Sequence, residues 1–208
     1  MNRVCAIISG GDFAPLDGIE KSDYIIACDK GLDYAASQGI TPDLILGDFD
    51  SCSGRLPDDI PVLSLPVMKD DTDTMAAIRH AADMNRFSEL RIYCALGGRL
   101  DHLFANIQAG AFAARHGLTV RISDENTRIV IMPPGEIRLP AEEDFSLSVF
   151  ALSDSCRGLS ISGALYTLDD AEITSSFPIG VSNQWAGDAL ISFTEGILMI
   201  VMSRMPNS

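Results

Sequence analysis

The sequence has few basic residues for its length and a large excess of acids. Its 15 lysines and arginines are outnumbered by 29 aspartates and glutamates, which gives a formal net charge of -14 at pH 7. A charge of this sign repels the phosphate backbone of nucleic acids and anionic membrane surfaces, so we expect neither as a partner. A phosphorylated nucleotide is not excluded, because divalent cations held by carboxylates can neutralise its phosphates, and a cationic molecule would be attracted.

Long apolar runs and paired cysteines are also missing. The apolar run at residues 4–8 is far shorter than the apolar region of a signal peptide or a membrane-spanning helix. The five cysteines are odd in number and widely spaced, with no Cys-x-x-Cys pair, which is typical of reduced thiols. We therefore expect a cytoplasmic protein, with Cys5, Cys28 and Cys94 as small core residues inside strands.

Two common nucleotide-binding fingerprints do not occur. The sequence has no Gly-x-x-x-x-Gly-Lys-Ser/Thr loop, which excludes ordinary P-loop kinases, and no Gly-x-Gly-x-x-Gly dinucleotide motif. The three histidines lack metal-ligand spacing, and we interpret His80 and His116 as surface or helix-end residues. Any phosphate or metal chemistry must therefore depend on other residues.

What is present first is an alternation of apolar runs with helical patterns. Strands are expected at residues 4–9, 24–28, 44–46, 91–96 and 118–123, and helices at 31–38, 72–85 and 101–116. Strands that are apolar on both faces and separated by helices are typical of a parallel sheet covered on both sides. The pattern predicts an N-terminal three-layer α/β domain at residues 1–127.

The character of the chain changes after this domain. No helical period follows the Pro133-Pro134-Gly135 segment, and short alternating runs occur at residues 145–151, 159–162, 189–193 and 197–202. Such runs, separated by Gly, Asp and Ser, are typical of antiparallel β structure. We predict a small β-sandwich domain at residues 128–208.

Acidic and glycine-rich segments follow the predicted strands. They are Ser9-Gly10-Gly11-Asp12, Asp29-Lys30-Gly31, Gly47-Asp48-Phe49-Asp50-Ser51, Lys69-Asp70-Asp71-Thr72-Asp73 and Gly97-Gly98-Arg99-Leu100-Asp101-His102. In open parallel sheets, ligands bind outside the carboxyl ends of the strands. Each segment alone could be a turn or a helix cap, since Asp, Thr and Gly are common in both. Together they indicate a site for a metal ion and phosphate groups.

Three features of these segments fit that chemistry. Asp48 and Asp50 point the same way if the chain stays extended, and closely spaced oxygen ligands suit Mg²⁺. A lysine beside three carboxylates, as at Lys69, is suited to gripping a metal-bound phosphate chain. Gly98 and Arg99 open a predicted helix, where backbone amides and a guanidinium could hold phosphate oxygens.

The same residues resemble the bacterial thiamine pyrophosphokinase family. The resemblance rests on the order and spacing of Asp-Lys-Gly, Gly-Asp-Phe-Asp-Ser, Asp-x-Thr-Asp, Gly-Arg-Leu-Asp-His and a late Gly-Val-Ser-Asn, and it extends from Ser9 to about Trp185. It implies transfer of pyrophosphate from ATP to thiamine, which gives thiamine diphosphate and AMP, with Mg²⁺ as cofactor. It also implies a homodimer in which the α/β domain of one subunit, which binds ATP and magnesium, meets the thiamine-binding β domain of the other.

The resemblance also implies roles for individual residues. The catalytic acids would be Asp29, Asp48, Asp50, Asp73 and Asp101, of which Asp48, Asp50 and Asp73 bind magnesium. The residues implied to bind ATP are Lys69, Thr72, Gly98 and Arg99, and those implied to bind thiamine are Tyr166, Ser182 and Asn183. For Tyr166, a half-buried strand aromatic is an equally good interpretation. Either Asp29 or Asp101 could orient or deprotonate the attacking hydroxyl.

The sequence departs from the family pattern at two positions and leaves other functions open. Asp71 stands where relatives often carry a basic residue, and Gln184 stands where they often carry an acid. One alternative is a nucleotide-binding oxidoreductase that uses the Gly97-Gly98 turn as a cofactor loop, although this leaves the acid cluster unexplained. Another is a non-catalytic metal or nucleotide sensor whose β domain recruits a partner.

Overall fold

A computed structural model describes residues 3–48, 57–66 and 71–206 of the chain, which divides into two compact units, Met1–Glu125 and Asn126–Ser208. The first unit contains β1 (Val4–Ile8), a 3-10 helix (Ile19–Lys21), β2 (Tyr24–Cys28), α1 (Gly31–Ser37), β3 (Leu44–Gly47), β4 (Val62–Ser64), α2 (Asp73–Asp83), β5 (Glu89–Tyr93), α3 (Leu100–Arg115) and β6 (Thr119–Ser123). The second contains β7 (Thr127–Met132), β8 (Gly135–Leu139), β9 (Phe145–Ala151), β10 (Ser155–Ala164), β11 (Leu168–Thr174), β12 (Gly180–Asn183), β13 (Trp185–Phe193) and β14 (Leu198–Arg204).

The strands of the first unit are parallel and lie in the order β6-β5-β1-β2-β3-β4. The chain begins in the middle of this order, adds β2 to β4 on one side of β1, and then returns to place β5 on the other side. The strand order therefore reverses between β1 and β5. In open α/β sheets, the crevice outside the carboxyl ends of the strands at such a reversal is the usual ligand site.

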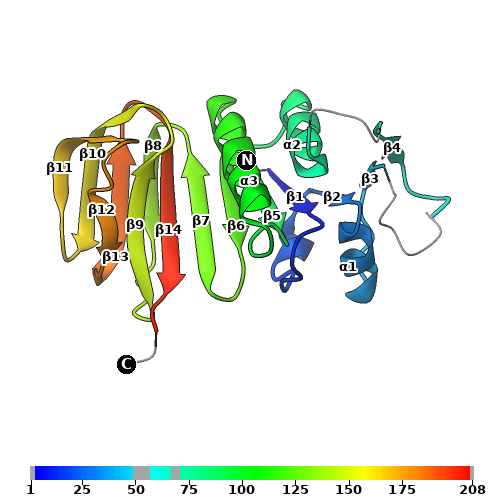
Figure 1. Ribbon diagram of the computed structural model, residues 1–208, viewed down its shortest axis with the longest axis horizontal. Coiled ribbons are helices and arrows are strands. Elements are labelled where there is room, and N and C mark those ends of the chain that lie inside the picture. The colour runs from blue at the N-terminus through cyan, green and yellow to red at the C-terminus, as the bar shows by residue number, and fades with distance from the viewer. Residues whose placement is uncertain (1–2, 49–56, 67–70, 207–208) are drawn as a thin grey trace. The chain divides into compact units, whose positions relative to one another are not determined.

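The helices of this unit cover the sheet on both faces (Figure 1). Ala35 of α1 packs in a core cluster with Ala6 and Ile8, which lie on one face of β1. The helices α2 and α3 contact each other, and α2 also contacts β1, β2 and β3. Alternate residues of β1 meet opposite faces, so a strand covered on both sides must be apolar throughout, and all five residues of β1 are buried.

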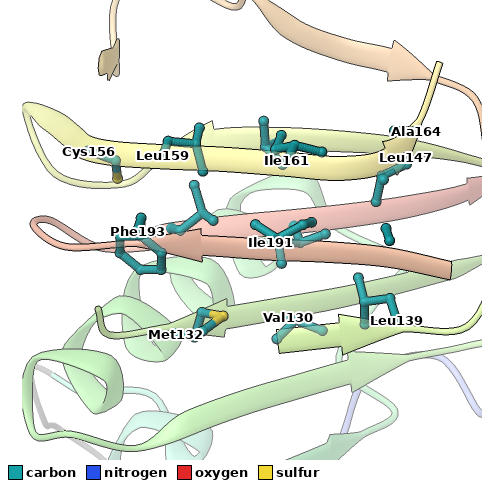
Figure 2. Close-up of a cluster of buried hydrophobic side chains, with 14 of the residues drawn as sticks. Val130, Met132, Leu139, Leu147, Cys156, Leu159, Ile161, Ala164, Ile191 and Phe193 are labelled. Carbon is teal, nitrogen blue, oxygen red and sulfur yellow. The ribbon is translucent and has the colours of Figure 1, made fainter. Parts of the chain in front are cut away.

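The second unit is a β-sandwich. The strands β12, β9, β14 and β7 pair antiparallel in that order, and β11, β10, β13 and β8 form a four-stranded antiparallel sheet. Side chains from the facing strands fill the space between them, among them Val130, Met132 and Leu147 on one side and Leu159 and Ile191 on the other (Figure 2). The expected α/β unit followed by a β-sandwich is confirmed.

The end of β5 differs from the expectation. The strand covers Glu89–Tyr93 instead of residues 91–96, and Cys94 follows it with a φ of 55°. A left-handed backbone cannot continue a strand, although the apolar run goes on to Leu96. The interpretation of Cys94 as a residue inside a strand is therefore wrong, although its side chain is buried.

No helix in the described part of the chain is long and apolar enough to span a membrane.

Candidate active site

A cavity of about 500 Å³ lies at the carboxyl ends of β1, β2 and β5, where the strand order reverses. Its wall comes from three loops and from the beginnings of α2 and α3. The lining residues are Ser9, Gly10, Gly11, Asp12, Cys28, Asp29, Lys30, Thr72, Asp73, Thr74, Ala95, Leu96, Gly97, Gly98, Arg99, His102 and Asn106. Four of the five segments that the sequence singled out therefore contribute to one cavity.

Hydrogen bonds hold the loop after β1 to its neighbours. The amide of Ser9 donates to the carbonyl of Tyr93 at 2.9 Å, and the amide of Gly11 donates to the carbonyl of Cys94 at 2.9 Å. The hydroxyl groups of Ser9 and Thr74 are hydrogen-bonded at 2.6 Å, and both residues are buried. The loop is thus fixed to the end of β5 and to the first turn of α2.

The loop after β5 is held from the helix that follows it. Asn106 of α3 is buried, and its side-chain amide donates to the carbonyl of Ala95 at 2.8 Å. This bond satisfies a buried backbone acceptor and fixes the distance between α3 and the loop. Asn106 therefore stabilises the loop after β5 at the cavity wall.

The Gly97-Gly98 turn contacts an acid that the sequence patterns did not assign. Both glycines have left-handed backbones, with φ values of 80° and 62°. A Cβ atom at Gly97 would lie 2.6 Å from the Oδ2 atom of Asp12, and one at Gly98 would lie 3.4 Å from its Oδ1 atom. Because glycine has no side chain, the Asp12 carboxylate can lie against this turn. From the sequence, the same turn was expected to face phosphate.

Asp29 occupies an unusual backbone position at the cavity wall. It has a φ of 43°, and its amide donates to the carbonyl of Leu46 at 3.2 Å. Its half-buried carboxylate lies against Gly47, where any side chain would collide with it. This contact brings Asp29 beside the residue that immediately precedes Asp48.

The three predicted metal ligands, Asp48, Asp50 and Asp73, are placed as follows. Asp73 lies in the first turn of α2 on the cavity wall, and half-buried Asp48 follows directly after β3. Asp50, together with the predicted phosphate ligand Lys69, lies outside the described residues. Within residues 3–48, 57–66 and 71–206, no three Asp, Glu, His or Cys side chains are grouped closely enough to hold a metal ion. The carboxylate donors at this edge suit a hard divalent cation such as Mg²⁺, but the ligand set itself stays a prediction.

Thr72 and Asp71 have structural partners at the start of α2. The hydroxyl oxygen of Thr72 accepts a hydrogen bond from the Met75 amide at 3.1 Å and caps the helix, while its own proton can still be donated to a ligand. Asp71 forms an ion pair with Arg79 of the same helix at 2.7 Å. Asp71, the residue that differs from the family pattern, is thus partly neutralised by an arginine of this chain.

Arg99 and Asp101 form a bidentate ion pair at the start of α3. The Nε atom of Arg99 donates to Oδ1 of Asp101 at 3.1 Å, and its Nη2 atom donates to Oδ2 at 2.5 Å. Hydrogen bonding to Arg99 lowers the pKa of Asp101, and the same contact raises the pKa of Arg99. The ion pair therefore favours the ionised form of Asp101 and makes its carboxylate a weaker proton acceptor.

Lys30 lines the cavity beside the Gly10-Gly11 loop, and Tyr34 lies against it. The ammonium nitrogen of Lys30 lies 5.3 Å from the ring centroid of Tyr34. A hydrogen bond to the Tyr34 side chain raises the pKa of Lys30, so the ammonium stays charged at neutral pH. The Tyr34 hydroxyl also donates to the carbonyl of Gly11 at 2.9 Å. The Asp-Lys-Gly segment was noticed in the sequence, but no role was assigned to its lysine.

The predicted thiamine-binding residues lie together in the second unit. Tyr166 is 70% exposed. The Asn183 side chain accepts from the Tyr166 amide at 2.9 Å and donates to its carbonyl at 2.7 Å. Ser182 has a left-handed backbone with a φ of 59°, and its amide donates to the Ser148 hydroxyl at 3.0 Å. Tyr166 and Asn183 border a small apolar hollow of about 50 Å³, which could admit only part of an aromatic ring.

The described cysteines are buried free thiols. Burial raises the pKa of Cys5 to about 12, and it also raises the pKa values of Cys94 and Cys156. These three thiols are thus protonated at neutral pH and are poor nucleophiles.

Comparison with known proteins gives consistent matches. Residues 17–122 match the family model described as "Thiamin pyrophosphokinase, catalytic domain", and residues 136–198 match the one described as "Thiamin pyrophosphokinase, vitamin B1 binding domain". The chain is 29% identical over 185 residues to a thiamine pyrophosphokinase of Bacillus subtilis, with 86% of each chain covered.

Solved structures agree with these matches. The crystal structure of the thiamine pyrophosphokinase from Bacillus subtilis superposes with a TM-score of 0.83 at 26% identity and covers 98% of this chain and 100% of its own. The enzyme from Geobacillus thermodenitrificans gives a TM-score of 0.80 at 25% identity, with 98% and 99% covered. A thiamin pyrophosphokinase from Candida albicans shares the fold at 16% identity, with a TM-score of 0.74 and 97% and 89% covered.

Proposed function

The chain belongs to the thiamin pyrophosphokinase family, and we propose that the cavity at the ends of β1, β2 and β5 is where its catalytic unit binds ATP. The observation that supports this proposal is the composition of the cavity at the reversal of strand order. It combines two glycine loops, the carboxylates of Asp12, Asp29 and Asp73, and the cations of Lys30 and Arg99. The family assignment favours pyrophosphoryl transfer over the oxidoreductase and the sensor.

The reaction is the transfer of the pyrophosphoryl group of ATP to thiamine, in which one bond to the β-phosphorus forms and another breaks. The hydroxyl oxygen of thiamine forms a bond to the β-phosphorus, and the bond from that phosphorus to the α–β bridging oxygen breaks. AMP leaves with that oxygen, and the hydroxyl proton passes to a base. Phosphoryl transfer of this kind depends mainly on positioning and on neutralising charge.

We assign the proton-accepting role to Asp29. Its carboxylate is half-buried on the cavity wall, and its position is fixed by a left-handed backbone and by contact with Gly47. Asp101 is the weaker candidate, because the ion pair with Arg99 lowers its pKa. In this assignment Asp101 orients Arg99 toward the phosphates.

We propose Mg²⁺ as the divalent cation, with Asp48, Asp50 and Asp73 as the carboxylates that would hold it. When bound, the ion supplies positive charge to the phosphate oxygens. Thr72, Gly98, Arg99 and Lys69 would contact the nucleotide directly. Thr72 can do so as a hydrogen-bond donor while its oxygen caps α2.

We propose that thiamine is bound by the second unit through Tyr166, Ser182 and Asn183. The exposed Tyr166 ring offers a flat face to the aminopyrimidine and thiazolium rings. Asn183 acts by fixing the backbone of Tyr166, because both ends of its amide are engaged there. The acids of the catalytic unit supply negative charge for the cationic thiazolium.

We further propose that the protein is a cytoplasmic homodimer in which each catalytic unit works with the thiamine-binding unit of the partner. Support for the location comes from the odd number and wide spacing of the five cysteines, which are typical of reduced thiols. Analytical ultracentrifugation tests this proposal. A protein that is monomeric at the concentration at which it is fully active would contradict a site shared between subunits.

The direct test is to incubate the purified protein with ATP, MgCl₂ and thiamine and to measure AMP and thiamine diphosphate. We expect both products in equal amounts, and neither when thiamine is omitted. ADP with thiamine monophosphate as the products would show transfer of a single phosphoryl group. Absence of any product would overturn the proposed function.

A further inference from the structure

We propose that Lys30 binds the phosphates of ATP and that Tyr34 is the positioning residue that holds the Lys30 ammonium group at the cavity wall. This inference rests on the proposed function and adds a phosphate ligand and its support to the site. It follows from three observations in the first unit: the location of Lys30, the charges around it and the two-sided contact of Tyr34.

The location of Lys30 places a cation at the cavity wall. The residue follows β2 directly after Asp29, it is exposed, and it lines the cavity. Its neighbour across the loop is the Gly10-Gly11 segment, since the Cβ of Lys30 would be 3.6 Å from a Cβ built at Gly10. A lysine at this position can reach the anionic part of a ligand that lies along the glycine loop.

The charges around the cavity indicate which substrate group Lys30 contacts. Asp12, Asp29 and Asp73 line the same wall, and Arg99 shares its charge with Asp101 in a bidentate pair. A triphosphate entering this acidic cavity needs cations to offset the repulsion. The thiazolium of thiamine is itself cationic, so an ammonium cannot favour it. Lys30 therefore discriminates for the phosphorylated substrate.

Tyr34 has the contacts that a positioning residue needs. Its ring lies beneath the Lys30 ammonium, with 5.3 Å between nitrogen and centroid, and its hydroxyl is tied to the Gly11 carbonyl at 2.9 Å. The Phe13 ring packs on it edge-to-face at a centroid distance of 5.3 Å. Tyr34 thus links the lysine of one loop to the glycine backbone of another, and it restricts the rotamers of a side chain that would otherwise be free.

The test separates ATP from thiamine as the affected substrate. We expect Lys30→Gln to raise the KM for ATP, and the Kd of ATP with MgCl₂ in calorimetry, by about tenfold, the usual scale for a charge-assisted contact. The KM for thiamine should change by less than about twofold, and Lys30→Arg should restore most of the ATP affinity. Lys21→Gln, which removes the same charge from an exposed position at the end of the 3-10 helix, is the matched control and should leave both constants unchanged.

The role of Tyr34 is tested by a double-mutant cycle. Tyr34→Phe keeps the ring and removes the hydroxyl, so we expect about a threefold rise in the KM for ATP, and almost no further rise when Lys30 is already Gln. Tyr24→Phe is the control for removing a tyrosine hydroxyl elsewhere in this unit. An equal effect of Tyr34→Phe in both backgrounds would show that the Tyr34 hydroxyl does not act through Lys30, and it would overturn the positioning role.

Two outcomes would overturn the assignment of Lys30: an unchanged KM for ATP in Lys30→Gln, or equal rises in the constants for ATP and thiamine. The proposed function could fail while the inference about Lys30 is still tested. If the wild-type protein forms no AMP, its binding of ATP with MgCl₂ can still be measured by calorimetry. Weaker ATP binding by Lys30→Gln in that titration would keep the inference, and equal binding would end it.

Discussion

The two units fix their candidate site residues by different means. In the catalytic unit these residues lie on short loops after parallel strands, and the loops are tied together by backbone bonds such as Gly11 to Cys94. In the thiamine-binding unit they lie on or beside antiparallel strands, and a side chain, Asn183, fixes the exposed Tyr166. In the first arrangement the candidate side chains, such as Asp29, Asp73 and Arg99, lie outside the buried core, although apolar residues of the same loops belong to it. In the second, the site borders the core directly, since Tyr166 follows β10, whose Leu159, Ile161 and Ala164 belong to the core of the sandwich.

Damage to the core of the second unit should destabilise that unit more than any other change considered for it. Leu159 is fully buried between the sheets, so Leu159→Ala should lower the free energy of unfolding by about 2–5 kcal/mol. Urea unfolding followed by the fluorescence of Trp185, the single tryptophan, reports on this unit. The control Leu165→Ala removes a leucine that is 56% exposed and should have little effect. Equal losses in the two variants would show that the sandwich core is not what stabilises this unit.

The second prediction sharpens the contrast for the catalytic unit. Asp73→Asn should reduce kcat by about 10²–10³-fold, which corresponds to about 3–4 kcal/mol, because it removes a carboxylate from the cavity wall. The melting temperature should hardly change. Asp83→Asn, at the other end of the same helix, should retain full activity. Normal turnover by Asp73→Asn would remove this residue from the proposed metal site.

The third prediction tests whether the two substrates are divided between the units. Tyr166→Ala and Ser182→Ala should each weaken the use of thiamine by about 1–3 kcal/mol, the scale for losing a stacking partner or a buried hydrogen bond. Calorimetric titration with ATP and MgCl₂ should give an unchanged Kd. Phe177→Ala, at another exposed aromatic residue of this unit, is the control. Loss of ATP binding with unchanged thiamine affinity would move these residues to the nucleotide site.

The smallest expected effect concerns Thr72, where structure and function coincide. Thr72→Ala should cost about 1 kcal/mol of stability, because the amide of Met75 loses its cap, and it should also weaken ATP binding. Thr72→Ser keeps the hydroxyl and should retain both properties. Far-UV circular dichroism measures the first unit selectively, since all helices of the described chain lie there. Unchanged helix stability in Thr72→Ala would contradict the capping role.

Much of the fold could be predicted from the sequence because apolar runs and helix caps are local signals. The strands β1 and β3, which are buried throughout, and the helix after Thr72 are of this kind, as is the mostly buried β2. Strands whose residues are mostly exposed carry no such signal. β4 is exposed at all three positions, and β11 includes Asp169, Asp170 and Glu172, so neither was expected.

The candidate site was predictable only in part. Motifs identified Asp29, Asp73 and Arg99, and the structure brings all three to one cavity. The contacts of Asp12 and Tyr34 depend on loops that are distant in sequence, such as Gly97 meeting Asp12, and no local pattern encodes them. The pairing of Arg99 with Asp101 is a choice of rotamer, which the sequence does not specify either.

The left-handed backbone at Asp29 limits which amino acids evolution or a mutant library can place there. At a φ of 43°, Gly, Asn and Asp are tolerated, whereas β-branched and bulky side chains are strained. Of the three, only Asp has a carboxylate. A saturation library selected for folding alone should therefore recover Gly and Asn along with Asp, while the same library selected for turnover should retain only Asp. Position 29 would then look invariant among active sequences, with the backbone excluding most alternatives before the chemistry excludes the rest.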